Sequence, residues 1–273
     1  MKETIQVHSR EQLLRYAHVN AQGDVSLKPN QVYILHTPIT VKSLLLTGDT
    51  EIRGIRKQHA SLTLTKAGVG ISGNHLDKLT LRHLKLSSGA KTSLFDLIGD
   101  TVRIHECSLN AQHLGRIHLQ SLGMHEVHIE QMLQGMSIRS LQDLNMKFMT
   151  IRNSSGALLD LSTAKIGSAI KLKRIRVGES FKNHFELLRM ETHIGRDIYR
   201  PEFTDEVEKV IHIEDTHLTV KSINSYRTIL ESRDKLITGF KYTEQDSQDG
   251  YILQPSTDMR RRVSLSNVST LTP

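Results

Sequence analysis

Two adjacent carboxylates, Glu214 and Asp215, are the candidates for acid–base chemistry in this chain of 273 residues. Cleavage of a glycosidic bond uses a pair of carboxyl groups, and a lyase uses carboxylate-bound calcium with a basic residue. Neighbouring side chains on a strand point to opposite faces, so these two need a turn to converge. We treat Glu214 and Asp215 as the candidate catalytic residues of a polysaccharide lyase or glycoside hydrolase.

Histidine is abundant, with 15 residues, and the stretch that contains His105 and His128 is the richest. Neutral imidazoles bind zinc and iron, which makes His105 and His128 candidate metal ligands. The chain has no H-x-H pair and no HExxH motif, so solvent-facing histidines are the competing interpretation. We expect no cofactor, and we expect the single cysteine, Cys107, to be an inert core residue.

The chain carries 36 basic and 29 acidic residues, a net charge of +7 that permits an acidic partner. The candidate binding residues are Lys171, Lys173, Arg174 and Arg176, and the triplet of Arg260, Arg261 and Arg262 is a candidate contact of a partner arm. Cross-strand ion pairs are the competing explanation for the first group. Trp is absent and aromatic residues make up 4%, which counts against the aromatic stacking surfaces that bind single-stranded nucleic acid and sugars. Nucleic acid is therefore not an expected partner.

The elements that must position these residues follow from a repeat with apolar residues at positions 1, 3, 6 and 8 of an eight-residue window. Its copies are Leu79-Leu81-Leu84-Leu86, Val102-Ile104-Cys107-Leu109, Leu144-Met146-Met149-Ile151 and Ile170-Leu172-Ile175-Val177, with partial copies at Val127-Ile129-Met132 and Ile211-Ile213-Leu218. Two short strands meeting at a corner satisfy this spacing. Stacked coils then bury one continuous aliphatic core, which predicts an all-β fold, a parallel β-helix.

Aligning the windows predicts which outward residues are neighbours. We expect His105 to lie beside Glu130, Glu130 beside Lys147, and Arg174 beside Asp215. Opposite charges on neighbouring strands stabilise a sheet by a few tenths to about 1 kcal/mol per pair.

The chain divides into three predicted parts. Residues 1–30 form an N-terminal cap with a short helix, because Ser9 and Gln12 fit a capping box. Residues 31–242 form the β-helix, with a lateral insertion at about 191–209 where the repeat breaks. Residues 243–273 are polar and rich in Ser and Thr, which predicts a C-terminal arm or tail. No secretory signal and no apolar run long enough for membrane insertion are seen.

The first predicted coils resemble those of pectin-lyase-like right-handed parallel β-helix proteins, and of phage tailspike-type members in particular. The matching residues are Tyr33, Leu35, Ile39, Val41, Leu46, Gly48, Ile52 and Gly54. The resemblance implies a right-handed solenoid and, by analogy with tailspikes, a homotrimer packed side by side. It is specific for fold and leaves function open, because such folds host unrelated activities.

The leading functional hypothesis is a non-enzymatic virion structural or attachment protein, such as a tailspike-like or capsid decoration component. Its partners would be other virion proteins or a host-surface glycan. The alternative is a lyase or hydrolase acting on an acidic glycan. A cytoplasmic scaffold or nucleic-acid-binding solenoid is a third hypothesis.

Overall fold

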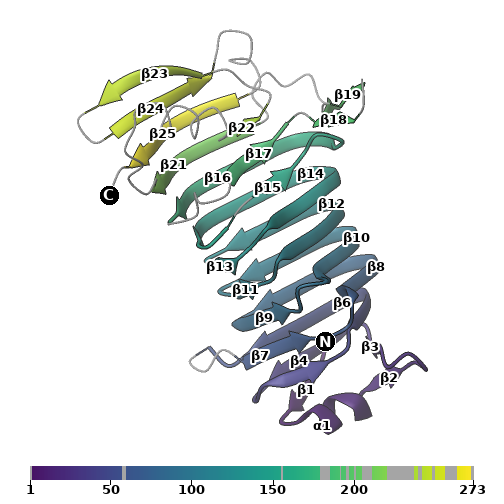
Figure 1. Cartoon of the computed structure of the whole chain (residues 1–273). Helices are drawn as coiled ribbons and strands as arrows, with labels where there is room; N and C mark the ends of the chain where they lie inside the picture. Colours follow the sequence, from purple (N-terminus) through teal and green to yellow (C-terminus); the bar gives the residue numbers. More distant parts are fainter. Residues whose placement is uncertain are drawn as a thin grey trace.

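Stacked parallel strands run through the computed structural model of the chain from its N-terminal end (Figure 1). The structure describes residues 2–56, 60–154, 156–178, 185–190, 192–194, 197–199, 201–204, 211–219, 237–238, 242–247, 250–255 and 263–271. The long ladder consists of β1 (Glu3–Val7), β4 (Gln31–Leu35), β6 (Leu44–Gly54), β8 (Gly68–Arg82), β10 (Thr92–His105), β12 (His113–His125), β14 (Gln134–Ile151), β16 (Lys165–Val177), β21 (Ile211–Thr219) and β25 (Val263–Leu271), each parallel to the next. These pairings confirm the all-β parallel solenoid.

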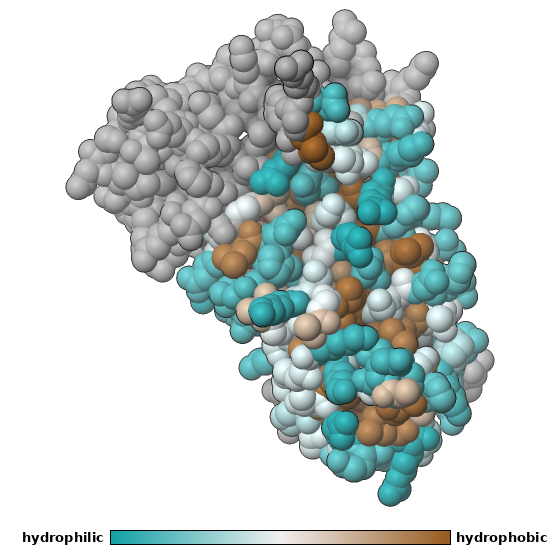
Figure 2. All heavy atoms as spheres, turned by 45° about the vertical axis from the view of Figure 1, so that its right-hand side comes forward, coloured by the Kyte–Doolittle hydropathy of each residue, from teal (hydrophilic) through white to brown (hydrophobic). Residues whose placement is uncertain are grey.

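Shorter strands complete each coil. Around one corner lie β5 (Ile39–Val41), β7 (Ala60–Leu64), β9 (Leu84–Ser88), β11 (Ser108–Asn110) and β13 (His128–Gln131), which also pair in parallel. Towards the C-terminal end, β15 (Gly156–Asp160), β17 (Phe185–Arg189) and β22 (Ile237–Thr238) extend another side of the coil. Figure 2 shows hydrophilic side chains over much of the described surface, with smaller apolar patches between them.

The core consists of columns of aliphatic side chains held in register. At each of the four inward positions, the residues from successive coils lie directly above one another, and none is more than 1% exposed. The columns from β8 onward contain Leu79, Val102, Leu122, Leu144, Ile170 and Ile211; Leu81, Ile104, Met124, Met146, Leu172 and Ile213; Leu84, Cys107, Val127, Met149 and Ile175; and Leu86, Leu109, Ile129, Ile151 and Val177. The predicted spacing of 1, 3, 6 and 8 is therefore the pattern of this core. Burial raises the pKa of the Cys107 thiol to about 12, as expected of an inert core residue.

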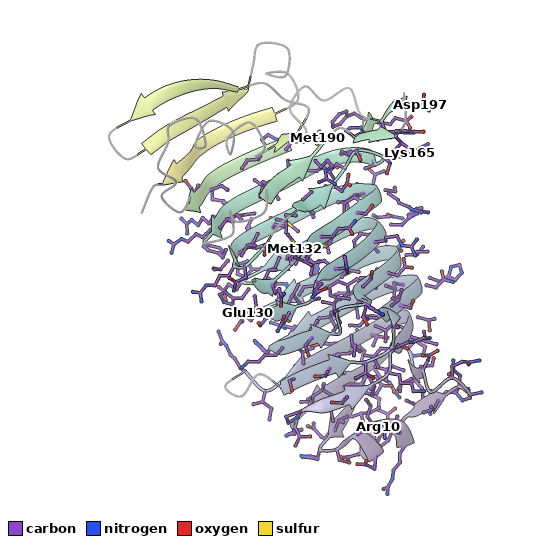
Figure 3. All side chains as sticks on the ribbon, viewed as in Figure 1. Arg10, Glu130, Met132, Lys165, Met190 and Asp197 are labelled. Atoms are coloured by element: carbon purple, nitrogen blue, oxygen red, sulfur yellow. The ribbon has the colours of Figure 1, made fainter. Side chains whose placement is uncertain are left out.

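One predicted window was out of register by five residues. The structure pairs Leu122 with Leu144 and His125 with Lys147, so the true window of this coil runs from Leu122 to Ile129. Val127 occupies position 6 rather than position 1, because the steps 1, 3 and 6 also fit Val127-Ile129-Met132. Glu130 consequently lies around the corner on β13, exposed, with Met132 buried two residues later (Figure 3). The expected neighbours of Glu130, His105 and Lys147, are wrong.

From β8 to β21, the corner between positions 3 and 6 uses a left-handed residue. The residue at position 5 has a φ between +47° and +56° in six successive coils: His83, Glu106, Glu126, Phe148, Arg174 and Asp215. This conformation costs a residue with a Cβ about 1 kcal/mol or more, and glycine adopts it freely. The column of corners is therefore a repeated strain that the packed core sustains.

The N-terminal segment contains one short helix and a hairpin. Ser9 accepts a hydrogen bond from the backbone N–H of Gln12 and precedes helix α1 (Arg10–Arg15), whose Leu13 is buried. The strands β2 (Ala17–Val19) and β3 (Val25–Leu27) form an antiparallel hairpin. Within the described residues, no helix has the length and apolar character to cross a bilayer.

An ion pair between a buried carboxylate, Asp24, and a partly exposed lysine, Lys66, joins this hairpin to the solenoid. The side chain of Asp24 is 6% exposed, lies 2.7 Å from Lys66 Nζ and accepts hydrogen bonds from Ser43 and Asn20. The hydrogen bond from Lys66, followed by that from Ser43, lowers the pKa of Asp24 to about 2.

The segments expected as an insertion and an arm contain further strands. In the first, β18 (Thr192–Ile194) and β19 (Asp197–Tyr199) form an antiparallel hairpin, and β20 (Glu202–Phe203) pairs with β16. In the second, β23 (Tyr242–Ser247) pairs antiparallel with β24 (Gly250–Pro255), and β25 lies parallel to β21.

Replacing Asp24 with Asn is expected to lower the free energy of unfolding by about 2 kcal/mol at neutral pH. Because the folded-state pKa is depressed, this stabilisation is present above about pH 4 and disappears as the pH falls towards 2. Urea unfolding of both proteins across this range measures the difference. An unchanging difference between wild type and variant would contradict the ionic origin of the stabilisation.

Replacing Glu126 with Gly is expected to raise the free energy of unfolding by about 1 kcal/mol, because glycine relieves the left-handed corner. The matched control is Glu130→Gly in strand β13, where the same change should lower stability by about 1 kcal/mol. Thermal unfolding of the two variants compares them. Equal destabilisation in both would show that the corner is unstrained.

Candidate anion-binding face

The outward positions 2 and 4 of the long ladder carry a concentration of cations. In the register of β8 to β16, position 2 reads Thr80, Arg103, Gly123, Asn145 and Lys171, and position 4 reads Arg82, His105, His125, Lys147 and Lys173. Successive residues in such a column lie about 4.8 Å apart. We call the seven members with a basic side chain the basic face: Arg82, Arg103, His105, His125, Lys147, Lys171 and Lys173.

Among the described residues, some basic side chains have a carboxylate partner and others, such as Lys85 on β9, have none. Away from this face, ion pairs join Lys2 to Asp49, Lys66 to Asp24 and Arg116 to Asp96. In the part of the chain that the structure describes, no carboxylate pairs with Arg103, Lys147 or Lys171. At these three positions the basic face presents positive charge that no carboxylate of the described residues neutralises.

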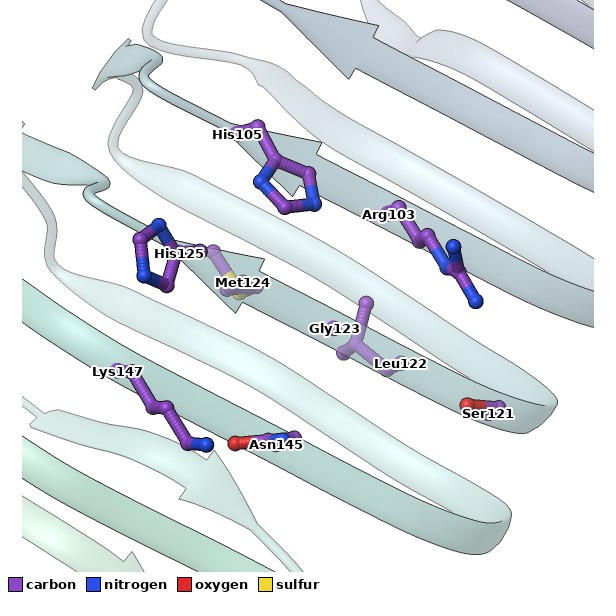
Figure 4. A pocket seen from close by; sticks show the side chains of 9 residues that line it. All are labelled: Arg103, His105, Ser121, Leu122, Gly123, Met124, His125, Asn145 and Lys147. Atoms are coloured by element: carbon purple, nitrogen blue, oxygen red, sulfur yellow. The ribbon is translucent and has the colours of Figure 1, made fainter.

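A hollow of about 330 Å³ lies in the middle of this face (Figure 4). It spans three neighbouring strands, β10, β12 and β14, and no carboxylate is among its lining residues. The lining consists of Arg103, His105, Ser121, Leu122, Gly123, Met124, His125, Asn145 and Lys147. Figure 4 shows the polar side chains of the outer two strands flanking Gly123 on the middle strand. The hollow is of the size of a small ligand pocket, about 300 Å³ upwards.

The two imidazoles in the hollow are neighbours on adjacent strands. The ring centroids of His105 and His125 lie 5.7 Å apart. Partial burial lowers the pKa of His105, and charge interactions with Arg82, His125 and Arg103 lower it further, whereas Glu106 opposes them. At neutral pH the His105 ring is therefore uncharged and offers one donor and one acceptor.

An aromatic side chain, Phe148, borders the basic face at the corner of its coil. The ring of Phe148 meets the His125 ring edge-on at 5.2 Å, and the Arg174 guanidinium lies 5.0 Å from the Phe148 centroid. Phe148 is 38% exposed despite its left-handed backbone. These contacts hold the Phe148 ring at the border of the hollow, next to the lining residues His125 and Lys147.

The four predicted binding residues do not form one strip. Lys171 and Lys173 both lie on the basic face, where Lys173 pairs with Glu214 at 2.7 Å. Arg174 is the corner residue of its coil, and Arg176 lies beyond the corner, beside Thr150 of β14. The corner after position 4 separates residues that are consecutive in the sequence.

The candidate catalytic carboxylates are both engaged by cations of the preceding coil. Glu214 accepts a hydrogen bond from Lys173, and Asp215 Oδ2 lies 3.7 Å from Arg174 Nε, which confirms the predicted pairing of Arg174 with Asp215. The hydrogen bond from Lys173 is the main cause that lowers the pKa of Glu214.

The candidate metal ligands His105 and His128 lie on different sides of a corner. His105 ends β10, whereas His128 begins β13 and pairs with Ser108 and Thr150. Among the described residues, no three His, Cys, Asp or Glu side chains are grouped to hold a metal ion. Arg260, Arg261 and Arg262 lie outside the described residues.

The sequence pattern predicts few of the residues that line the hollow. Of His105, His125, Asn145, Lys147 and Gly123, it gives only His105 as a candidate, and as a metal ligand. The window Leu122-Met124-Val127-Ile129 fits positions 1, 3, 6 and 8 completely and contained the signal. In the register of that window, His105, His125 and Lys147 align in one outward column.

Comparisons with known proteins add little to this geometry. No family model matches the chain, and no curated protein matches it. Among solved structures it is similar to a pectin methylesterase from Yersinia enterocolitica, with 12% identity, a TM-score of 0.25, and coverage of 98% of this chain and 76% of the other. Similarity at this level carries no argument about activity. The conclusion is that this chain is a parallel β-solenoid, established by its own strand pairings.

Proposed function

We propose that this chain is a non-enzymatic attachment protein whose basic face binds an acidic glycan. The observation that carries the proposal is the set of cations Arg103, Lys147 and Lys171, which have no carboxylate partner among the described residues. Proteins ordinarily mix the signs of their surface charges, and a large field of one sign favours a partner of the opposite charge.

The regular spacing of the face supports a linear partner. Basic side chains recur on consecutive strands of one ladder, at intervals of about 4.8 Å along the solenoid axis. An extended polymer with a repeated negative charge, lying along that axis, meets a basic residue on every coil from β10 to β16. A single small anion would occupy only part of this row.

The side chains of the face favour a glycan over nucleic acid. Ser121, Asn145 and the neutral His105 offer hydrogen bonds of the kind that sugar hydroxyls make. Aromatic stacking serves bases and sugar rings alike, so the preference for a glycan depends on these hydrogen-bonding groups. The one aromatic ring described at the border, Phe148, already contacts His125 and Arg174.

The electrostatics of the carboxylate pair supports binding without cleavage. A general acid for glycoside hydrolysis needs a raised pKa so that it carries a proton near neutral pH. The pKa of Glu214 is lowered by Lys173, and the Asp215 carboxylate lies beside Arg174. Both side chains are suited to holding adjacent coils together.

The wider role follows the resemblance of the first coils to tailspike-type proteins. We place the chain among virion structural or decoration components that contact a host-surface glycan. Association of three copies side by side belongs to the same proposal, and sedimentation of the purified chain measures it.

Replacing Lys147 or Arg103 with Ala is expected to weaken binding of polygalacturonate about tenfold, because each removes an unscreened charge-assisted contact. Titration calorimetry at low salt measures the affinity, which should fall as salt rises. The control is Lys85→Ala, an exposed lysine on β9 outside the basic face.

Three results would contradict the proposal. One is equal affinity in Lys147→Ala, Arg103→Ala and Lys85→Ala. Another is tighter binding of single-stranded DNA than of any acidic glycan. The third is release of reducing or unsaturated ends from the polymer during the titration, which would make the chain an enzyme.

A further inference from the structure

Gly123 interrupts the outward column at position 2. On one side its neighbour in the ladder is Arg103 and on the other it is Asn145, and both extend a side chain from the sheet. Because Gly123 has no side chain, the backbone of β12 forms the floor of the hollow. Gly123 is thus the residue that makes the basic face concave.

The fold does not require glycine at this position. The backbone of Gly123 is outside the left-handed region, and an added Cβ would meet only Arg103 Cγ, at 3.9 Å. At Gly115, in contrast, φ is +117° and an added Cβ would collide with the Phe95 carbonyl oxygen. Glycine inside a strand destabilises it, and where backbone strain does not demand it, it often marks the close approach of a ligand.

The groups around the gap are suited to an oxyanion. Arg103 and Lys147 supply positive charge, Asn145 and Ser121 supply neutral donors, and no carboxylate lines the hollow. Carboxylate and sulfate groups share the property of several acceptor oxygens on one centre, and they form strong charge-assisted hydrogen bonds with such donors. The concave shape admits a group that projects from a polymer lying along the face.

We infer that the hollow above Gly123 is a subsite for a single projecting oxyanion, the carboxylate or sulfate substituent of an acidic sugar. The inference rests on the proposed glycan-binding function and adds to it a defined pocket on the basic face. Attraction by net charge alone would be indifferent to a neutral side chain at residue 123. A subsite would be blocked by it.

The test is a pair of uncharged substitutions, Gly123→Ala and Gly123→Thr, in the full-length chain. The Cβ of Ala has ordinary van der Waals room, so this variant is expected to fold, and Thr fills more of the hollow. We expect a graded loss of affinity, reaching about tenfold to a hundredfold for Thr, because the oxyanion loses its contacts with the donors. The probes are polygalacturonate for carboxylates and dextran sulfate for sulfates, with neutral dextran as the blank.

The control is Ala169→Thr, which adds the methyl and hydroxyl groups that distinguish Thr from Ala, on the same ladder outside the hollow. Its affinity should equal that of the wild type. Thermal unfolding supplies a second readout, since both replacements of Gly123 should raise the Tm by about 2 to 4 °C. Loss of binding together with higher stability separates a blocked subsite from a damaged fold.

The outcomes separate the inference from the function on which it depends. If the wild type binds neither charged polymer, the proposed function fails and the subsite fails with it. If Gly123→Ala and Gly123→Thr both bind the polymers as tightly as the wild type does, the subsite is overturned. The proposal that the basic face binds an acidic glycan then still stands. If only one polymer loses affinity in Gly123→Thr, that polymer identifies the oxyanion as carboxylate or sulfate.

Discussion

The in-register stacking of parallel strands is the constraint on which the rest of the molecule depends. Each inward position repeats above itself from coil to coil, so aliphatic side chains such as Leu122 and Leu144 contact along continuous columns. The same register fixes every outward residue beside its counterpart in the next coil, about 4.8 Å away. One strand register therefore determines both the contacts of the core side chains and the neighbours of the outward side chains. The neighbours of a charged outward residue follow from that register.

This register makes the basic face energetically unusual. Lys147 and Lys173 lie directly opposite one another, an arrangement of like charges that destabilises a sheet. The same register brings opposite charges together where Lys173 meets Glu214, at one end of the face, and where Arg116 meets Asp96, away from it. The corner residues add a second repeated strain, since Phe148 and Arg174 adopt left-handed backbones. A continuous apolar core sustains both, and an anionic partner would relieve the repulsion on the face.

Periodicity predicted the core of this fold better than it predicted the surface. Positions 1, 3, 6 and 8 are each buried as expected, including Cys107, because burial of apolar residues is what creates the pattern. A shift of five residues satisfied the same pattern at Val127, so Glu130 was assigned to the wrong column. The residues at the left-handed corners are not glycines, so the sequence does not reveal the corner that separates Lys173 from Arg176. The hollow depends on an absent side chain at Gly123, and its meaning emerges only with Arg103 and Asn145 placed on either side.

Lysine labelling in the presence of polygalacturonate tests the central claim most directly, since it locates the bound polymer on the protein. Acetylation of each lysine is measured by mass spectrometry with and without the polymer. The basic face predicts that labelling of Lys147 and Lys171 falls while Lys85, on β9, reacts at an unchanged rate. Unchanged labelling of Lys147 and Lys171, or an equal fall at Lys85, would contradict binding at this face.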